Sequence, residues 1–506
     1  MFKPELFNSL KGYNGKTFLS DLIAGIIVGI VALPLAIAFA IASGVGPERG
    51  LFTAIIAGFC ISFFGGSKVQ IGGPTGAFAV IVFGVVQEFG FAGLATATVM
   101  AGILLILLGV FKMGGLVKFI PYTIVTGFTA GIAVTIFVGQ IGDFLGLTTG
   151  KMPGDFIGKI GVYAKSISTI NWYSFGMALI SLIIIFVWPK VSKKIPGSLI
   201  VIILATLLNL VFEKTLGWHT DTIGSRYGEI PSSLPAPALP DFSIGAITKL
   251  FPTAISIAVL AAIESLLSAV VADGMIGSKH DSNTELVAQG IANIASPLFG
   301  GIPATGAIAR TATNIKNGGR TPIAGIVHAV VLLLIMMLLG KYAVYIPMAA
   351  LSAVLVSVAW NMAGLPAVKA LLKGQKSDIC VLLVTFLITV FIDLTVAIEV
   401  GLGFAAFFFI KKMIDVSEVQ TKHNILTGGI TDNGKEEELT IPEKTVVYEI
   451  EGPLFFGTVR KFELAMEKAK IDCKAFIIRM RNTNYIDAGG LRALEQCKEA
   501  CDRKKI

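Results

Sequence analysis

Apolar segments long enough to cross a lipid bilayer recur along most of this chain of 506 residues. They run from residue 21 to about residue 412, and each is close to the roughly 17 to 25 residues that a hydrocarbon core requires. Only 15% of the residues are charged, against about 25% in typical soluble domains. The sequence therefore predicts a polytopic α-helical membrane protein, and the polar stretch after residue 412 predicts a second, soluble domain.

A polar, proline-rich loop at about 213–250 separates the apolar segments into two sets of seven. An odd number of spans gives the two halves opposite orientations, so any resemblance between them must be an inverted repeat. We predict a transmembrane domain at 21–412 with repeats at about 21–212 and 252–411. The fourteen expected spans lie near residues 21–43, 49–65, 75–88, 91–111, 119–140, 172–189, 196–212, 252–273, 285–299, 305–315, 322–340, 345–361, 378–392 and 394–411.

An even number of spans places both chain termini on the same side of the membrane. The positive-inside rule predicts that this side is cytoplasmic, because lysines between the spans gather there. These lysines are Lys190, Lys193, Lys194, Lys369, Lys373, Lys376, Lys411 and Lys412. We therefore expect a multi-pass protein of the cytoplasmic (inner) membrane, with residues 1–20 as a cytoplasmic N-terminal segment. The same rule accounts for the net charge of +8, so no nucleic-acid partner is expected.

Two short stretches share the pattern Thr-Gly-Ala, one in each half, beginning at Thr75 and Thr305. Each follows glycines and a proline, which are poor helix-interior residues, so the backbone is expected to be extended until a half-helix begins at the threonine. Half-helices in spans 3 and 10 would occupy corresponding positions, which is typical of transporter binding sites. The alternative is that the small residues form a generic helix-packing interface.

The N-terminal end of each half-helix is expected to attract an anion, because it carries roughly half a positive charge. Two such ends facing each other would hold a small anion between them. The threonines would cap the first turns or donate hydroxyls to the anion, and the glycines would let it approach the backbone. The predicted binding residues from these segments are Thr75, Gly76, Ala77, Thr305, Gly306 and Ala307.

Two further positions are candidates for the same site. Arg310 adds a full positive charge near the second half-helix, although a cytoplasmic charge at the end of a span is an equal alternative. Pro34 interrupts the first apolar segment, and a break there would turn Leu35 and Phe39 toward the site. An ordinary proline kink packed against lipid or protein is the other interpretation.

Glu264 lies in the middle of an apolar segment, where a carboxylate costs about 2.5 to 3.5 kcal/mol on insertion scales. Burial favours the neutral form of a carboxyl group, which predicts a proton carrier that permits an anion to bind beside it. Ser268, one turn further on, makes a sodium site the rival interpretation. A carboxylate paired with a neighbouring helix is the third.

From the remaining reactive residues we expect no metal site and no cofactor, and we do not expect the protein to be an enzyme. Neither the five cysteines nor the four histidines have the spacing of a metal site. A nucleotide-binding loop and a nucleophile triad are also missing from the sequence.

Several segments resemble the sulfate permease (SulP) family of anion transporters, and together they span essentially the whole chain. They are Leu33–Ala40, Gly73–Gly76, Ala262–Gly274 and Phe299–Gly301. The resemblance implies a seven-plus-seven inverted repeat with a core domain and a gate domain. It also implies a homodimer and an anion site between the third and tenth spans, lined by the first and eighth.

Residues and resemblance together predict a secondary active transporter that moves sulfate or a related small anion, coupled to protons through Glu264. Within the resembled family, bicarbonate and C4-dicarboxylates are the alternative substrates, with proton or sodium as the coupling ion. An anion channel of the same fold is the alternative of a different class.

Residues 441–506 resemble a STAS domain, a cytoplasmic α/β module, and residues 413–440 are expected to be a linker. Alternating apolar positions predict a strand at Val446–Glu451, a helix at Gly457–Lys470, a strand at Lys474–Met480 and a helix opening at Asp487. Ala488 stands where related modules carry a phosphorylated serine, so phosphorylation is not expected there. The pattern lacks a further strand and helix, which predicts a partial module.

Overall fold

The chain forms two compact units, Met1–Gly401 and Leu402–Ile506. This division lies within the helix α18 (Leu394–Val416), earlier than the boundary predicted at residue 412. The computed structural model describes residues 2–115, 120–150, 152–192, 196–392, 394–416, 418–422, 425–430, 436–442, 444–468 and 473–506. Lys193 and Lys194, used above to orient the chain, lie outside the described residues.

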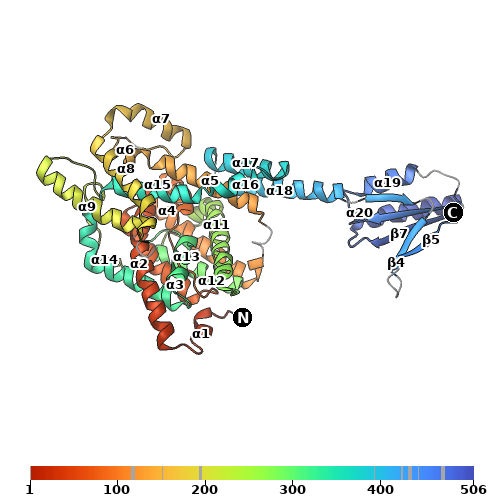
Figure 1. The fold of residues 1–506 in the computed structure, drawn as a ribbon, viewed down its shortest axis with the longest axis horizontal. Helices are drawn as coiled ribbons and strands as arrows, with labels where there is room; N and C mark the ends of the chain where they lie inside the picture. Colours follow the sequence, from red (N-terminus) through yellow and green to blue (C-terminus); the bar gives the residue numbers. More distant parts are fainter. Residues whose placement is uncertain are drawn as a thin grey trace. The chain divides into compact units, whose positions relative to one another are not determined.

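The first unit is almost entirely helical (Figure 1). Its α-helices are α1 (Glu5–Ser9), α2 (Gly15–Ala42), α3 (Pro47–Phe64), α4 (Gly76–Val110), α5 (Tyr122–Gly139), α6 (Ile141–Leu145), α7 (Phe156–Ser166), α8 (Trp172–Val187), α9 (Gly197–Leu216), α10 (Ile223–Tyr227), α11 (Ile244–Ile276), α12 (Ser282–Leu298), α13 (Ile308–Lys316), α14 (Ile323–Leu339), α15 (Met348–Met362), α16 (Leu365–Leu371) and α17 (Lys376–Phe391), with α18 crossing into the second unit. Short 3₁₀ turns lie at Ile167–Thr169, Trp188–Lys190 and Gly340–Tyr345.

Each of the fourteen predicted spans coincides with a helix or part of one. Nine helices among the described residues are long and apolar enough to cross a membrane. Several others are short, as interrupted spans are expected to be. The number of crossings and the inverted repeat stay predictions.

Two helices differ from the expected pattern of breaks. The third and fourth predicted spans form one helix, α4, whose direction changes at Gly90, where φ is +67°. Only glycine adopts such a conformation at little cost, so the kink is encoded locally. Helix α2, in contrast, continues through Pro34 without a break. Of the two interpretations of Pro34, the structure excludes the break and keeps a buried proline within a continuous helix, which membrane helices tolerate.

The helices of the first unit pack into two bundles. The first bundle contains α2, α3, α4, α11, α12, α13 and α14. The second bundle contains α5, α6, α7, α8, α9, α15, α16 and α17. Helices α2 and α4 of the first bundle also contact α15 and α5 of the second. The face between the bundles is therefore where parts from both halves of the chain meet.

Glycines permit a close helix crossing within the first bundle, that of α4 and α12. A Cβ on Gly102 of α4 would lie 2.7 Å from the carbonyl oxygen of Gly290 on α12, and a Cβ on Gly290 would meet the Gly102 carbonyl in the same way. Such close approach of backbones lets membrane helices gain packing energy without a hydrophobic driving force.

Gly102→Ala is therefore expected to destabilise the first bundle by about 1 to 3 kcal/mol, the usual cost of overpacking. A thermal unfolding curve of the purified protein measures the effect. Gly84→Ala on the same helix is the control, because a Cβ there meets nothing within 4 Å. Equal melting temperatures for the two variants would contradict the close approach of α4 and α12 at Gly102.

The second unit carries an α/β sheet of order β3-β6-β7. Its elements are β3 (Glu418–Lys422), β4 (Ile425–Ile430), β5 (Glu436–Thr440), β6 (Thr445–Glu451), α19 (Val459–Lys468), β7 (Ala475–Asn482) and α20 (Ala488–Lys504). Strands β6 and β7 are parallel and joined through α19, as the sequence predicts, while β3 runs antiparallel to β6 and β4 pairs with β5. Within the segment predicted as a linker, 413–440, the strands β3, β4 and β5 form ladders that local sequence does not reveal. The bounds of the linker and of the STAS domain stay predictions.

Asp487 caps α20 by accepting hydrogen bonds from two backbone N–H groups, those of Gly490 at 2.8 Å and Phe456 at 2.9 Å. The Gly490 donor, followed by that of Phe456, holds the pKa of this carboxyl below its ordinary value. The cap thus also ties α20 to the segment that follows β6.

Candidate functional site

Two extended segments from opposite halves of the chain cross in the first bundle. Gly72–Gly73 (β1) pairs antiparallel with Thr305–Gly306 (β2), with Gly72 opposite Gly306 and Gly73 opposite Thr305. The N–H group of Ala307 also donates to the Ile71 carbonyl at 2.8 Å. All of these residues are buried, so extended backbone inside the apolar region satisfies its hydrogen bonds by pairing.

A helix begins directly after each crossing segment. Helix α4 begins at Gly76, with Thr75 as its N-cap residue, which agrees with the predicted start. Helix α13 begins at Ile308 with Ala307 as N-cap, three residues later than predicted. The prediction failed because Thr305 and Gly306 are held in the strand pair, where their backbone cannot enter a helix. The two helix N-termini lie on either side of the crossing.

Thr75 does not cap its own helix with its side chain. Its hydroxyl instead donates to Oε2 of Glu264 on α11, at 2.9 Å. The carboxyl group therefore lies at the N-terminal end of α4, although the two residues are far apart in sequence. Glu264 also lines a cavity of about 40 Å³ whose other walls include Ile124 and Phe128 of the second bundle.

Thr305 and Gly306 are held by α11 rather than left open. The Thr305 hydroxyl lies 2.7 Å from the Ser265 hydroxyl and donates to the Ala261 carbonyl at 3.2 Å. The N–H group of Gly306 donates to Ser265 Oγ at 3.1 Å, and a Cβ on Gly306 would overlap the Gln70 amide. These two residues therefore build the crossing itself.

Arg310 lies one turn into α13 with only 2% of its surface exposed. Its Nη2 donates to the carbonyl of Pro74, the residue before Thr75. Its Nη1 is buried and has no hydrogen-bond partner among the described residues. The guanidinium therefore joins the second half-helix to the start of the first, and it is not an exposed charge at the end of a span.

Apolar side chains close the space in front of Gly76. A Cβ at this position would lie 3.0 Å from Ile136 of α5, 3.0 Å from Met362 of α15 and 3.2 Å from the Phe39 ring. Ala77 is fully buried in the same turn. Phe39 of α2 thus lies close to the start of α4, while Leu35 is half-buried against the apolar core of the first unit.

Ser268 does not accompany Glu264. Its hydroxyl is fully buried and lies 3.5 Å from that of Thr311 on α13. The arrangement brings Thr75, Gly76 and Glu264 together in front of the crossing, with Arg310 buried beside it. Sequence reasoning missed the partners Ser265, Gln70, Ile136 and Met362, because serine, amide and apolar residues within spans carry no distinctive pattern.

A model of the sulfate permease family matches residues 18–385. The chain belongs to the sulfate permease family. A STAS-domain model matches residues 437–506. Sulfate permeases are transporters, so this chain is a multi-pass membrane transporter with a C-terminal STAS domain and not an enzyme.

Curated relatives of this sulfate permease extend over nearly its full length. "Putative sulfate transporter YvdB" of Bacillus subtilis (strain 168) is 47% identical over 480 residues, which cover 94% of this chain and 88% of YvdB. "Bicarbonate transporter BicA" of Synechocystis sp. (strain ATCC 27184 / PCC 6803 / Kazusa) is 32% identical over 502 residues, covering 96% and 86%.

Solved structures of the same fold exist. The transmembrane domain of a cyanobacterial BicA matches the sulfate permease chain with a TM-score of 0.68 at 32% identity, covering 78% of this chain and 98% of that one. The structure of SLC26A9 matches with a TM-score of 0.83 at 20% identity, covering 98% and 85%. At that identity the likeness concerns the fold alone.

Proposed function

We propose that this sulfate permease is a secondary active transporter that carries sulfate or a related small oxyanion, driven by a proton that Glu264 carries. The observation that carries the proposal is the meeting of two helix N-termini beside the buried guanidinium of Arg310. Three sources of positive potential at one point favour an anionic guest.

Sulfate is the first substrate we propose, because YvdB, which is 47% identical over 480 residues, carries the name "Putative sulfate transporter". Bicarbonate is the alternative, because BicA relatives carry that name at 32% identity. A C4-dicarboxylate remains a third candidate from the sequence alone.

We propose that transport involves movement of the first bundle against the second. The site lies at the face between the bundles, and Phe39, Ile136 and Met362 close it from both. Sliding of the bundles would separate these side chains and open the region in front of Gly76. A movement of two packed bodies about a fixed site is the usual form of alternating access.

Proton coupling is favoured over sodium coupling by the surroundings of Glu264. Its carboxyl group accepts a hydrogen bond from Thr75, next to the proposed anion position. Loss of the negative charge on protonation would remove repulsion of the anion. Ser268, the expected second sodium ligand, lies against α13 instead. We also propose a homodimer in the cytoplasmic membrane with both termini in the cytoplasm.

The test is reconstitution in liposomes with labelled sulfate, bicarbonate and succinate, each with a pH gradient, a sodium gradient or neither. We expect saturable accumulation of sulfate that follows the pH gradient. Accumulation driven by a sodium gradient alone would show that sodium, and not the proton, is the coupling ion. Large unitary currents without accumulation would establish a channel, and absence of anion movement under all conditions would overturn the proposal.

Gly76→Val is expected to reduce anion uptake by at least about tenfold, because its methyl groups would fill the position that the anion approaches. Gly84→Val on the same helix is the matched control, since its Cβ meets open space. Initial uptake rates and melting temperatures are compared for both. Normal uptake by Gly76→Val would place the anion elsewhere.

A further inference from the structure

A cavity of about 610 Å³ lies beyond the closed site, at the C-terminal ends of α2 and α5. Ala79 and Val80 of α4, about one turn past Gly76, form part of its wall, and so does Ile136. Helix α2 runs from the N-terminal side of the membrane to this cavity, so the cavity lies on the side opposite the N-terminus. It is therefore a vestibule on the path to the site.

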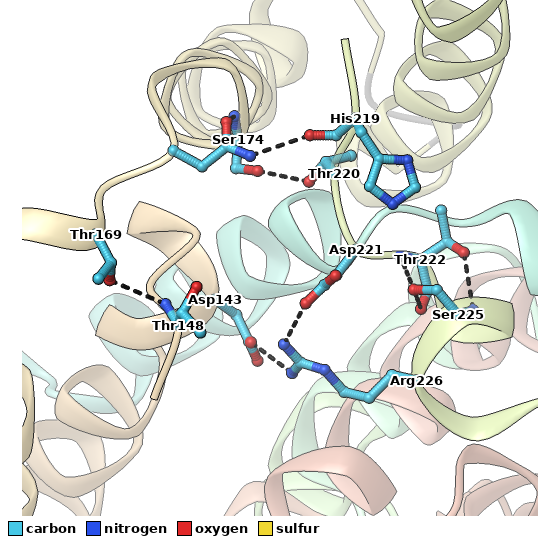
Figure 2. Close-up of polar contacts among 11 residues, drawn as sticks. Asp143, Thr148, Thr169, Ser174, His219, Thr220, Asp221, Thr222, Ser225 and Arg226 are labelled. Carbon is cyan, nitrogen blue, oxygen red and sulfur yellow. Dashed lines mark hydrogen bonds and ion pairs between the residues drawn. The ribbon is translucent and has the colours of Figure 1, made fainter. Parts of the chain in front are cut away.

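Polar side chains from several elements line the vestibule, and Figure 2 shows some of them, among them Asp143, Asp221 and Arg226. Arg226 of α10 lies between two carboxylates, Asp143 at 2.6 Å and Asp221 at 2.9 Å. The hydroxyls of Ser174 and Thr220 lie 2.6 Å apart. Arg226 is thus fully paired and joins the loop between the two halves to α6 (Figure 2).

Lys159 of α7 is the other cation of the vestibule. It is 92% buried, having an exposed fraction of 8%. Its ammonium lies over the Phe83 ring of α4, 4.5 Å from the ring centre. Among the described residues its ammonium makes no ion pair, although the charge of Asp155 acts on it and the Asp155 carboxylate accepts the Gly158 N–H at 2.7 Å. A largely buried lysine that lines a cavity and makes no ion pair favours binding of an anion there.

We propose that the vestibule is a first binding station for the transported oxyanion, and that Lys159 is the cation that holds the anion there. Hydroxyl and amide donors that line the same cavity, from Thr148, Thr149 and Gln140, suit the oxygens of a tetrahedral or planar oxyanion. The cation–π contact links the second bundle to α4, so an anion at Lys159 lies on the surface that the bundles share. This inference rests on the proposed function.

If Lys159 binds the anion in the vestibule, its replacement should raise the KM only for transport that starts from the vestibule side, whereas a purely structural role would affect both directions. Labelled sulfate uptake is measured in right-side-out and inverted membrane vesicles that contain the full chain. In right-side-out vesicles we expect Lys159→Gln to raise KM by about fivefold or more and to leave the maximal rate unchanged, because a focusing charge mainly affects capture. The difference should shrink at an ionic strength of about 0.5 M, where charges are screened within a few ångströms.

Inverted vesicles should show no change in KM, since there the anion arrives from the other face. Lys165→Gln is the matched control, because Lys165 lies on the same helix, exposed and outside the vestibule lining. Lys159→Arg keeps the positive charge and should have a KM close to that of the wild type. A shift in both orientations, or equal KM values for Lys159→Gln and Lys165→Gln, would overturn the inference.

A second measurement does not depend on transport. Thr149→Cys places a thiol in the vestibule, and its modification by anionic and cationic thiol reagents is followed by mass spectrometry. We expect the anionic reagent to be favoured, sulfate to slow its reaction, and Lys159→Gln to remove both effects. If the wild type moves no anion but these effects appear, the proposed function fails and anion binding at Lys159 stands. If the wild type takes up anion but these effects are missing, the proposed function stands and the inference about Lys159 fails.

Discussion

Glu264→Gln is expected to abolish accumulation of sulfate driven by a pH gradient while leaving exchange of labelled for unlabelled sulfate intact. A gradient of one pH unit supports about tenfold accumulation per coupled proton, and the amide should lower this ratio to one. The physical reason is that glutamine accepts the Thr75 hydrogen bond but cannot take up a proton. Uptake and counterflow in liposomes measure the two activities separately.

Ser268→Ala is the control for this experiment, because Ser268 lies on the same helix with its hydroxyl turned to Thr311. It should retain coupling to protons. If Glu264→Gln still accumulates sulfate fully, the proton travels by another route. If Ser268→Ala loses coupling as well, a sodium or proton site that includes the serine becomes the better description.

Arg310→Gln is expected to lower sulfate transport by about 100-fold, which corresponds to roughly 3 kcal/mol and is typical of losing a buried charge-assisted contact. The variant removes both the positive charge and the donor to the Pro74 carbonyl, which holds the start of α4 near α13. Arg310→Lys retains the charge and should recover part of the rate. Initial rates over a range of sulfate concentrations measure the effect.

Lys316→Gln is the matched control, since Lys316 lies at the end of α13 and is exposed. It removes the same charge from the same helix and should leave the rate near the wild-type value. Melting temperatures separate loss of binding from loss of folding. A folded Arg310→Gln protein that transports at the normal rate would exclude the guanidinium from the anion site.

Local sequence predicted those features that depend on neighbouring residues. Gly72, Gly73 and Pro74 indicated an extended segment, and α4 begins at Gly76 as expected. In the second unit, alternating apolar residues predicted β6, α19, β7 and α20 close to their observed bounds. In each case the conformational limits of glycine and proline, or a simple apolar period, act within one segment.

The second half-helix shows where local reasoning stops. The stretch at Thr305 has nearly the same residues as that at Thr75, yet its helix begins at Ile308. The Gly306 N–H donates to Ser265 Oγ, and the Thr305 and Ser265 hydroxyls are hydrogen-bonded to each other, which keeps this stretch extended for longer. At Pro34 the sequence left a break and a packed proline open, and the structure shows a continuous helix. Neither the partner of Thr305 and Gly306 nor the continuity of α2 at Pro34 can be predicted from the residues of the segment itself.

The amino-acid sequence alone determined that this chain enters a membrane as helices, interrupts two of them, and carries a separate α/β module after them. Hydrophobic length and backbone limits are properties of short segments, so they can be read without a fold. Only the tertiary structure decided that Thr75 meets Glu264, that Arg310 is buried at the crossing, and that Lys159 lines a vestibule. Contacts of that kind join segments far apart in the chain, and they exist only once the helices have packed.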